Sequence, residues 1–116
     1  MRCKLLFLAL PLVLMGGAAA HAHASLERAN PPVGSTVRSA PRQVTLSFSQ
    51  KLEPSFSSAQ VRDAAGARVD QGARVSGTQI HVSVRPLPPG TYRVNWRVLS
   101  VDTHTTEGSF SFRVGQ

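Results

Sequence analysis

The chain has 116 residues, of which 13 are Lys or Arg and 6 are Asp or Glu, for a formal net charge of +7. This length supports one small domain. Nucleic-acid binders usually cluster their basic residues among exposed aromatics, whereas the arginines here are scattered singly among apolar residues. We therefore expect no nucleic-acid partner. Weak attraction to an acidic membrane surface stays open.

The first 22 residues have the layout of a secretory signal peptide. A basic start is followed by an apolar run over 5–15, too short to span a membrane, and then by small residues. Two cleavage sites fit: a cut after Ala22 would free His23, and a cut after Ala20 would free His21. We predict a signal peptide over 1–22 and one domain over 23–116.

The predicted mature domain contains no sulfur. Its 94 residues carry eleven basic and six acidic side chains, a net charge of +5, while Cys3, Met1 and Met15 all lie in the signal peptide. An exported chain could use disulfides, but this one has none to form. Any metal site must be built from imidazole, carboxylate and backbone groups, which leaves no soft ligand set for Cu(I).

Alternation of apolar and polar residues between turn signals predicts an all-β domain. The expected strands cover 25–28, 44–49, 59–63, 68–69, 79–84, 91–98 and 109–114. The joints between them are rich in Pro and Gly, so we predict a small Ig-like or Greek-key β-sandwich or barrel of about seven strands. The predicted core is Leu46, Phe48, Tyr92, Val94, Trp96, Val98, Phe110 and Phe112.

Two short patterns carry candidate metal chemistry. Either signal cleavage would place an α-amine beside imidazole nitrogens, a chelate suited to a divalent metal such as copper, although histidines near a cleavage site can be accidental. Asp102 and His104 are two apart, so in extended backbone their side chains leave one face with Cα atoms roughly 6.5 to 7 Å apart. The alternative is a polar turn in which Asp102 caps a backbone N–H.

Other polar residues have simpler expectations. His81 is expected to be an exposed strand histidine, and Glu107 a loop carboxylate. Sequence pattern does not decide whether the first strand and the 100–108 loop meet in space.

The mature chain resembles the CopC family of periplasmic copper-binding proteins over nearly its whole length. The resemblance is carried by His23, Leu26 and Pro31 at family spacing and by four runs of sequence. These runs are 46–49 (Leu-Ser-Phe-Ser), 89–98 (Pro-Gly-Thr-Tyr-Arg-Val-Asn-Trp-Arg-Val), 100–104 (Ser-Val-Asp-Thr-His) and 108–112 (Gly-Ser-Phe-Ser-Phe).

The resemblance implies a periplasmic protein that is not an enzyme and binds one Cu(II) ion for copper resistance or homeostasis. Its ligands would be the α-amine and imidazole of His23 with Asp102 and His104, which favours cleavage after Ala22. The implied exchange partner is a CopD-like inner-membrane protein, and a monomer is expected. Members with methionine-rich loops are described as also holding Cu(I), whereas this chain resembles the kind that holds Cu(II) alone.

Two positions depart from the family pattern. Thr103 stands where the family usually has glycine, and a β-branched residue would be strained if the backbone there needs a positive φ. Gln50 stands where many members have glutamate, and it can orient a ligand by hydrogen bonding without adding charge.

Two other functions fit parts of the sequence. An N-terminal histidine chelate with a second imidazole also forms the copper brace of polysaccharide monooxygenases, but Asp102 would crowd the copper there. An Ig-like interaction module without metal is the other alternative.

Overall fold

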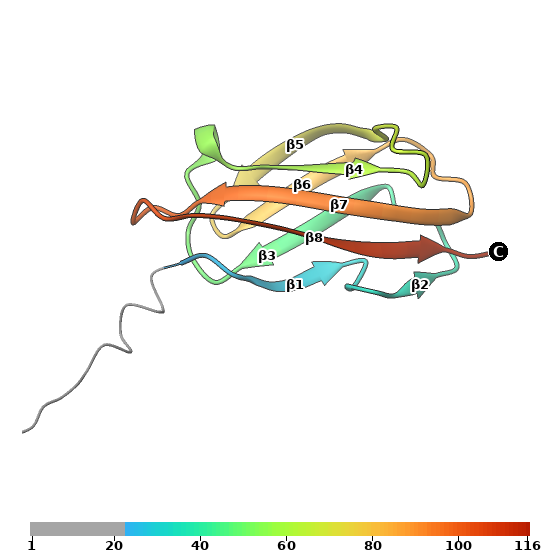
Figure 1. Ribbon diagram of the computed structural model, residues 1–116, viewed down its shortest axis with the longest axis horizontal. Helices are drawn as coiled ribbons and strands as arrows, with labels where there is room; N and C mark the ends of the chain where they lie inside the picture. The colour runs from blue at the N-terminus through green and yellow to red at the C-terminus, as the bar shows by residue number, and fades with distance from the viewer. Residues whose placement is uncertain (1–22) are drawn as a thin grey trace, which may run out of the picture.

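The computed structural model describes residues 23–116, so the predicted signal peptide and its cleavage sites lie outside the described residues. The described part forms eight strands and one short 3-10 helix (Figure 1). They are β1 (Leu26–Asn30), β2 (Thr36–Val37), β3 (Gln43–Phe48), η2 (Pro54–Phe56), β4 (Ser58–Arg62), β5 (Asp70–Ser76), β6 (Gln79–Val84), β7 (Gly90–Leu99) and β8 (Thr105–Val114). Within this part, no helix is long and apolar enough to cross a membrane.

The strands form two four-stranded sheets packed as a β-sandwich. Sheet A has the order β1-β3-β6-β5, and sheet B has the order β2-β8-β7-β4. Neighbouring strands are antiparallel except β2, which pairs with β8 in parallel. The predicted all-β sandwich is confirmed, and the barrel alternative is not what forms.

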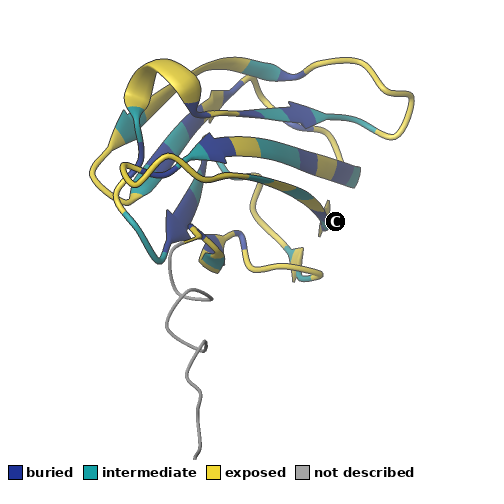
Figure 2. Ribbon diagram, turned by 60° about the vertical axis from the view of Figure 1, so that its left-hand side comes forward, coloured by how far each residue is buried: buried dark blue, intermediate teal, exposed yellow. Residues whose placement is uncertain are grey.

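The core lies between the two sheets because alternate side chains of each strand face inward. Figure 2 shows the resulting bands of buried and exposed residues along the strands. Seven of the eight predicted core residues are buried, and the eighth, Trp96, is partly buried against that core. Its ring meets the Phe48 ring edge-on at a centroid distance of 5.1 Å. Tyr92 also donates a hydrogen bond from its hydroxyl to the Pro88 carbonyl at 2.5 Å, which satisfies the polar end of this buried ring.

Two of the predicted strands need correction, and two observed strands, β2 and β5, were not predicted. The short return strand expected at 68–69 is only an isolated bridge between Arg68 and Arg62. The chain then crosses to sheet A, where β5 pairs with β6. The last strand starts at Thr105 rather than Ser109, because 105–108 pair with the end of β7 and lengthen the hairpin.

The start of β1 and the loop joining β7 to β8 lie at one end of the sandwich, and the C-terminus lies at the opposite end (Figure 1). Chain segments from the two extremes of the described sequence therefore meet at the first end. A hydrogen bond from the Thr106 hydroxyl to the Ala24 carbonyl, at 2.7 Å, joins them directly.

Candidate metal centre

The loop between β7 and β8 is a tight turn held by its own backbone. Ser100 donates its N–H to the His104 carbonyl at 2.9 Å, and Thr103 donates to the Ser100 carbonyl at 2.8 Å. Closing the turn places Thr103 at a φ of 74°, in the left-handed region. Position 103 therefore does require a positive φ, the condition under which a β-branched residue is strained.

The buried Ser100 side chain forms hydrogen bonds with Asp102 and His104 of this loop. It is fully buried, and its hydroxyl donates to Oδ1 of Asp102 and accepts the His104 N–H at 3.3 Å. The Ser100 hydrogen bond holds the pKa of the Asp102 carboxyl below its usual value. Desolvation opposes this shift, and His104 makes a further contribution that lowers the pKa. Asp102 is therefore ionised at neutral pH.

Asp102 and His104 lie together at the surface. The His104 Nδ1 is 3.4 Å from Oδ1 of Asp102, and their side chains are 46% and 40% exposed. The carboxylate is thus held beside one ring nitrogen, an arrangement that limits rotation of the imidazole. Exposure of both groups leaves them accessible to a ligand from solvent.

Hydrogen bonds hold the first residues of the described chain next to this loop. The Ser25 N–H donates to the Ser49 hydroxyl at 2.9 Å, and that hydroxyl donates to the His23 carbonyl at 3.3 Å. With the Thr106 bond to Ala24, these contacts fix the backbone of three consecutive residues. The backbone around His23 is therefore held by the hydroxyls of Ser49, just after β3, and Thr106, in β8, both far away in the sequence.

The result is that the His23 and His104 rings stack, with centroids 4.5 Å apart and planes inclined by 23°. Stacked imidazoles direct their in-plane lone pairs side by side and not toward a common point. Accordingly, among residues 23–116 no three His, Cys, Asp or Glu side chains stand ready-assembled as a metal site. A shared ion requires one ring to turn, and the α-amine of His23 exists only once the bond to residue 22 is cut.

The other polar residues considered from the sequence lie elsewhere. His81 is on the outer face of sheet A, where Nδ1 contacts Nε2 of Gln43 at 3.2 Å. Glu107 is an exposed residue of β8 and not of a loop, and it lies 3.5 Å from Arg97. Gln50 directly follows the Ser49 that holds His23.

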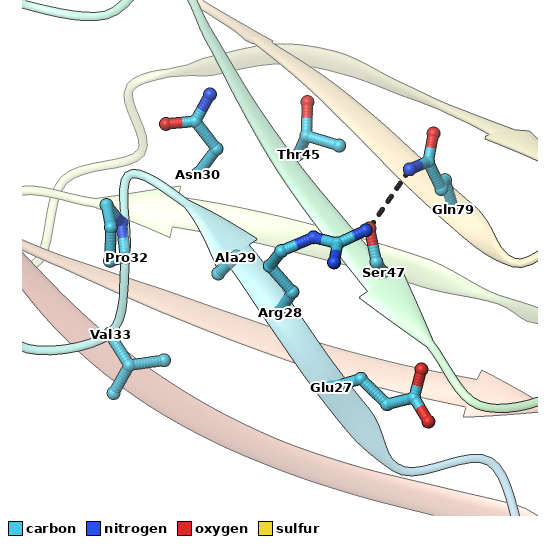
Figure 3. A pocket seen from close by; sticks show the side chains of 9 residues that line it. All are labelled: Glu27, Arg28, Ala29, Asn30, Pro32, Val33, Thr45, Ser47 and Gln79. Carbon is cyan, nitrogen blue, oxygen red and sulfur yellow. Dashed lines mark hydrogen bonds between the residues drawn. The ribbon is translucent and has the colours of Figure 1, made fainter.

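A groove of about 650 Å³ lies on the outer face of sheet A beside β1 (Figure 3). A hydrogen bond from Gln79 to the Ser47 hydroxyl, at 3.0 Å, crosses its floor. It is lined by Glu27, Arg28, Ala29, Asn30, Pro32, Val33, Thr45, Ser47 and Gln79. None of the three candidate ligands lines this groove, so the candidate metal centre is a surface site at the sandwich end.

Sequence reasoning missed three hydroxyls that shape this centre: those of Ser49, Ser100 and Thr106. The i, i+2 spacing of Ser100 and Asp102 was a usable signal, since a short hydroxyl side chain often bonds a nearby polar group in a turn. No local pattern marks Ser49 or Thr106, because their partners are 24 or more residues away.

This fold and this site define a class of protein: a small, mainly antiparallel β-sandwich with two imidazoles and a carboxylate close together at one end. Comparison with known proteins narrows the class. The family model for the CopC domain matches residues 26–115. Copper resistance protein C of Xanthomonas campestris pv. juglandis is 39% identical over 110 residues, which cover 86% of each chain.

Two solved structures are similar in fold and sequence. CopC from Methylosinus trichosporium OB3b superposes with a TM-score of 0.76 at 33% identity, covering 80% of this chain and 94% of that one. PcoC from Escherichia coli, described as a methionine-rich copper resistance protein, gives a TM-score of 0.70 at 35% identity, covering 80% and 99%. The chain belongs to the CopC family of copper resistance proteins.

Proposed function

We propose that this protein is a periplasmic carrier that binds one Cu(II) ion through the α-amine and imidazole of His23, the Asp102 carboxylate and the His104 imidazole. Cleavage after Ala22 would supply the amine. The observation that carries the proposal is the 4.5 Å stacking of the His23 and His104 rings, which brings together two imidazoles that are far apart in the sequence. Ionised Asp102 beside His104 adds the oxygen donor.

The donor set suits Cu(II) and not Cu(I). Imidazole, amine and carboxylate favour Cu(II), the tightest binder of the divalent series, whereas thioether and thiolate select Cu(I). PcoC is described as methionine-rich. Residues 23–116 of this chain contain no methionine and no cysteine, so here we propose a site that holds the oxidised ion alone.

The role we propose is transfer without catalysis. The Asp102 and His104 side chains are 40% and 46% exposed and His23 is also exposed, so a bound ion would be accessible to a membrane-bound exchange partner of the CopD kind. A polysaccharide-oxidising role is disfavoured because Tyr92 is buried and Trp96 packs against Phe48, which leaves neither ring displayed as a platform for sugar.

The test uses protein exported by its own leader. Its intact mass should correspond to a chain beginning at His23, and titration should give one Cu(II) per chain with nitrogen hyperfine structure in the spin-resonance spectrum. His104→Ala should change that spectrum and weaken binding, while His81→Ala, the matched control on the outer face of sheet A, should leave both unchanged.

A second variant isolates the amine. One extra residue placed before His23 keeps every side chain but moves the free amine away, so binding should weaken sharply. A mass showing a different first residue would overturn the proposed ligand set. So would equal Cu(II) binding by wild type and His104→Ala.

A further inference from the structure

The outer face of sheet B is an arginine surface. Alternation along β7 and β8 buries Tyr92, Val94, Phe110 and Phe112 and turns the residues between them outward. We call the outward arginines of β4, β7 and β8 the arginine face: Arg62, Arg93, Arg97 and Arg113. Three of them are exposed and Arg62 is half-buried.

Three of these arginines, Arg62, Arg93 and Arg113, are neighbours across the strands of sheet B. Arg62 and Arg93 are direct cross-strand partners, and Arg113 is a diagonal neighbour of Arg93 because it pairs with Thr91. Like charges placed directly opposite in a sheet destabilise it. The surface thus carries an electrostatic cost within the isolated domain.

The hydrogen-bond partners of the arginine face are almost all neutral. Arg62 donates to the Gly66 carbonyl at 2.8 Å and to Gln60, Arg93 donates to the Ser109 hydroxyl at 2.8 Å, and Arg113 donates to the Thr91 hydroxyl at 3.0 Å. Among the outward residues of the described strands of sheet B, the one carboxylate is that of Glu107, which lies 3.5 Å from Arg97. The face therefore has a net charge of +3, more than half of the +5 of residues 23–116.

The residues between the arginines identify the kind of partner. They are hydroxyl and amide side chains: Ser58, Gln60, Thr91, Asn95, Ser109 and Ser111. Protein–protein interfaces are usually centred on buried aromatic or aliphatic anchors, and the large exposed apolar residues of the described chain, Val33, Phe56 and Val101, all lie outside these strands. Guanidinium groups spread over a sheet face instead match an array of phosphates, which they bind through forked hydrogen bonds.

We propose that the arginine face binds the anionic phospholipid surface of a membrane. Binding there neutralises the opposed arginines and leaves the candidate metal centre free, because Asp102 and His104 lie between the end of β7 and the start of β8 and not within either strand. Figure 1 shows this loop at one end of the sandwich. A domain lying on its sheet B would keep that end beside the membrane. The inference does not depend on copper binding.

The test is co-sedimentation of the exported protein with vesicles of phosphatidylcholine containing 40% phosphatidylglycerol, compared with pure phosphatidylcholine vesicles. We expect binding only to the anionic vesicles, and its loss as ionic strength rises. Arg62→Gln combined with Arg93→Gln should weaken partitioning about 10- to 30-fold, since each basic residue near an anionic surface contributes about fivefold.

Arg28→Gln combined with Arg74→Gln is the matched control. It also removes two positive charges, but from the outer face of sheet A, where Arg28 pairs with Ser47 and Arg74 with His81. At physiological salt the Debye length is about 8 Å, less than the roughly 10 Å between packed sheets, so this pair should change partitioning about twofold or less.

Three results would overturn the proposal. An equal loss of vesicle binding in the two double variants would mean that binding depends on the net charge of the domain and not on the arginine face. Equal binding to neutral and anionic vesicles would exclude phosphate recognition. Retention on immobilised polyglutamate that depends on Arg62 and Arg93, without vesicle binding, would assign the face to an acidic polypeptide instead.

Discussion

Replacing Thr103 with glycine should stabilise the domain, although it removes a side chain. Thr103 has a φ of 74° in the loop between β7 and β8. Its Cβ and branched side chain are unfavourable in that region, whereas glycine occupies it freely. The side chain is exposed, so the substitution gives up little packing.

The magnitude follows from three effects. A non-glycine residue in the left-handed region costs about 1 to 2 kcal/mol, and β-branching puts Thr103 toward the upper end. Glycine gives back about 0.5 to 1 kcal/mol through the larger entropy of the unfolded chain. The hydroxyl bond to the Asp102 carbonyl, an exposed local contact, is also lost. We expect a net gain of about 0.5 to 1 kcal/mol.

The assay is thermal unfolding without metal, followed by circular dichroism. For a domain of this size, 1 kcal/mol shifts Tm by about 4 to 8 °C, so Thr103→Gly should raise Tm by about 2 to 8 °C. Thr103→Ala is the control, because it removes the branch and the hydroxyl but keeps Cβ in the left-handed region. It should recover at most about half of the gain.

Two results would refute this reasoning. A lower Tm for Thr103→Gly would show that the threonine hydroxyl contributes more than the backbone costs. An equal gain from Thr103→Ala would show that the relief comes from the branch and not from φ.

Three further predictions test other contacts. Gly108→Ala should lower stability by about 1 to 3 kcal/mol in denaturant titration, since its Cβ would lie 2.6 Å from the ring of Trp96, whose fluorescence should also change. Asp70→Ala should cost about 1 to 3 kcal/mol, because the 3% exposed carboxylate accepts the Val61 N–H and binds Arg68. Despite opposing desolvation, these partners lower the Asp70 pKa. The contribution of Asp70 to the free energy of unfolding is therefore present above about pH 4 and is lost as pH falls through the lower native pKa. In urea titrations, the difference in unfolding free energy between wild type and Asp70→Ala should shrink over the same pH range. Ser100→Ala should weaken Cu(II) binding about 10- to 100-fold in competition titration, whereas Ser83→Ala should not.

The strands that could be predicted are those in which apolar and polar residues alternate along the sequence. The runs at 91–98 and 109–114 are buried on one face and exposed on the other, and they became the central hairpin of sheet B. β5 was missed because it is an edge strand with mostly exposed residues, so no burial pattern marks it. β2 has two residues and exists only by pairing with β8, a tertiary contact without a local signal.

The candidate site was predictable in part. Asp102 and His104 were singled out by their spacing, but the approach of His23 came from family resemblance and not from pattern. That approach depends on Ser49 and Thr106, whose hydrogen bonds to the first residues arise only after both sheets have formed. A rule based on neighbouring residues has no access to such contacts.

The bond between Ala24 and Thr106 closes a loop of 82 residues, nearly the whole described domain. Contacts this distant form only after the entropy of ordering the intervening chain has been offset by the rest of the fold. A nascent or truncated chain that stops before β8 therefore cannot juxtapose His23 and His104. Stacking of the two rings therefore reports that folding is complete, and such a fragment would contain both histidines without bringing them into contact.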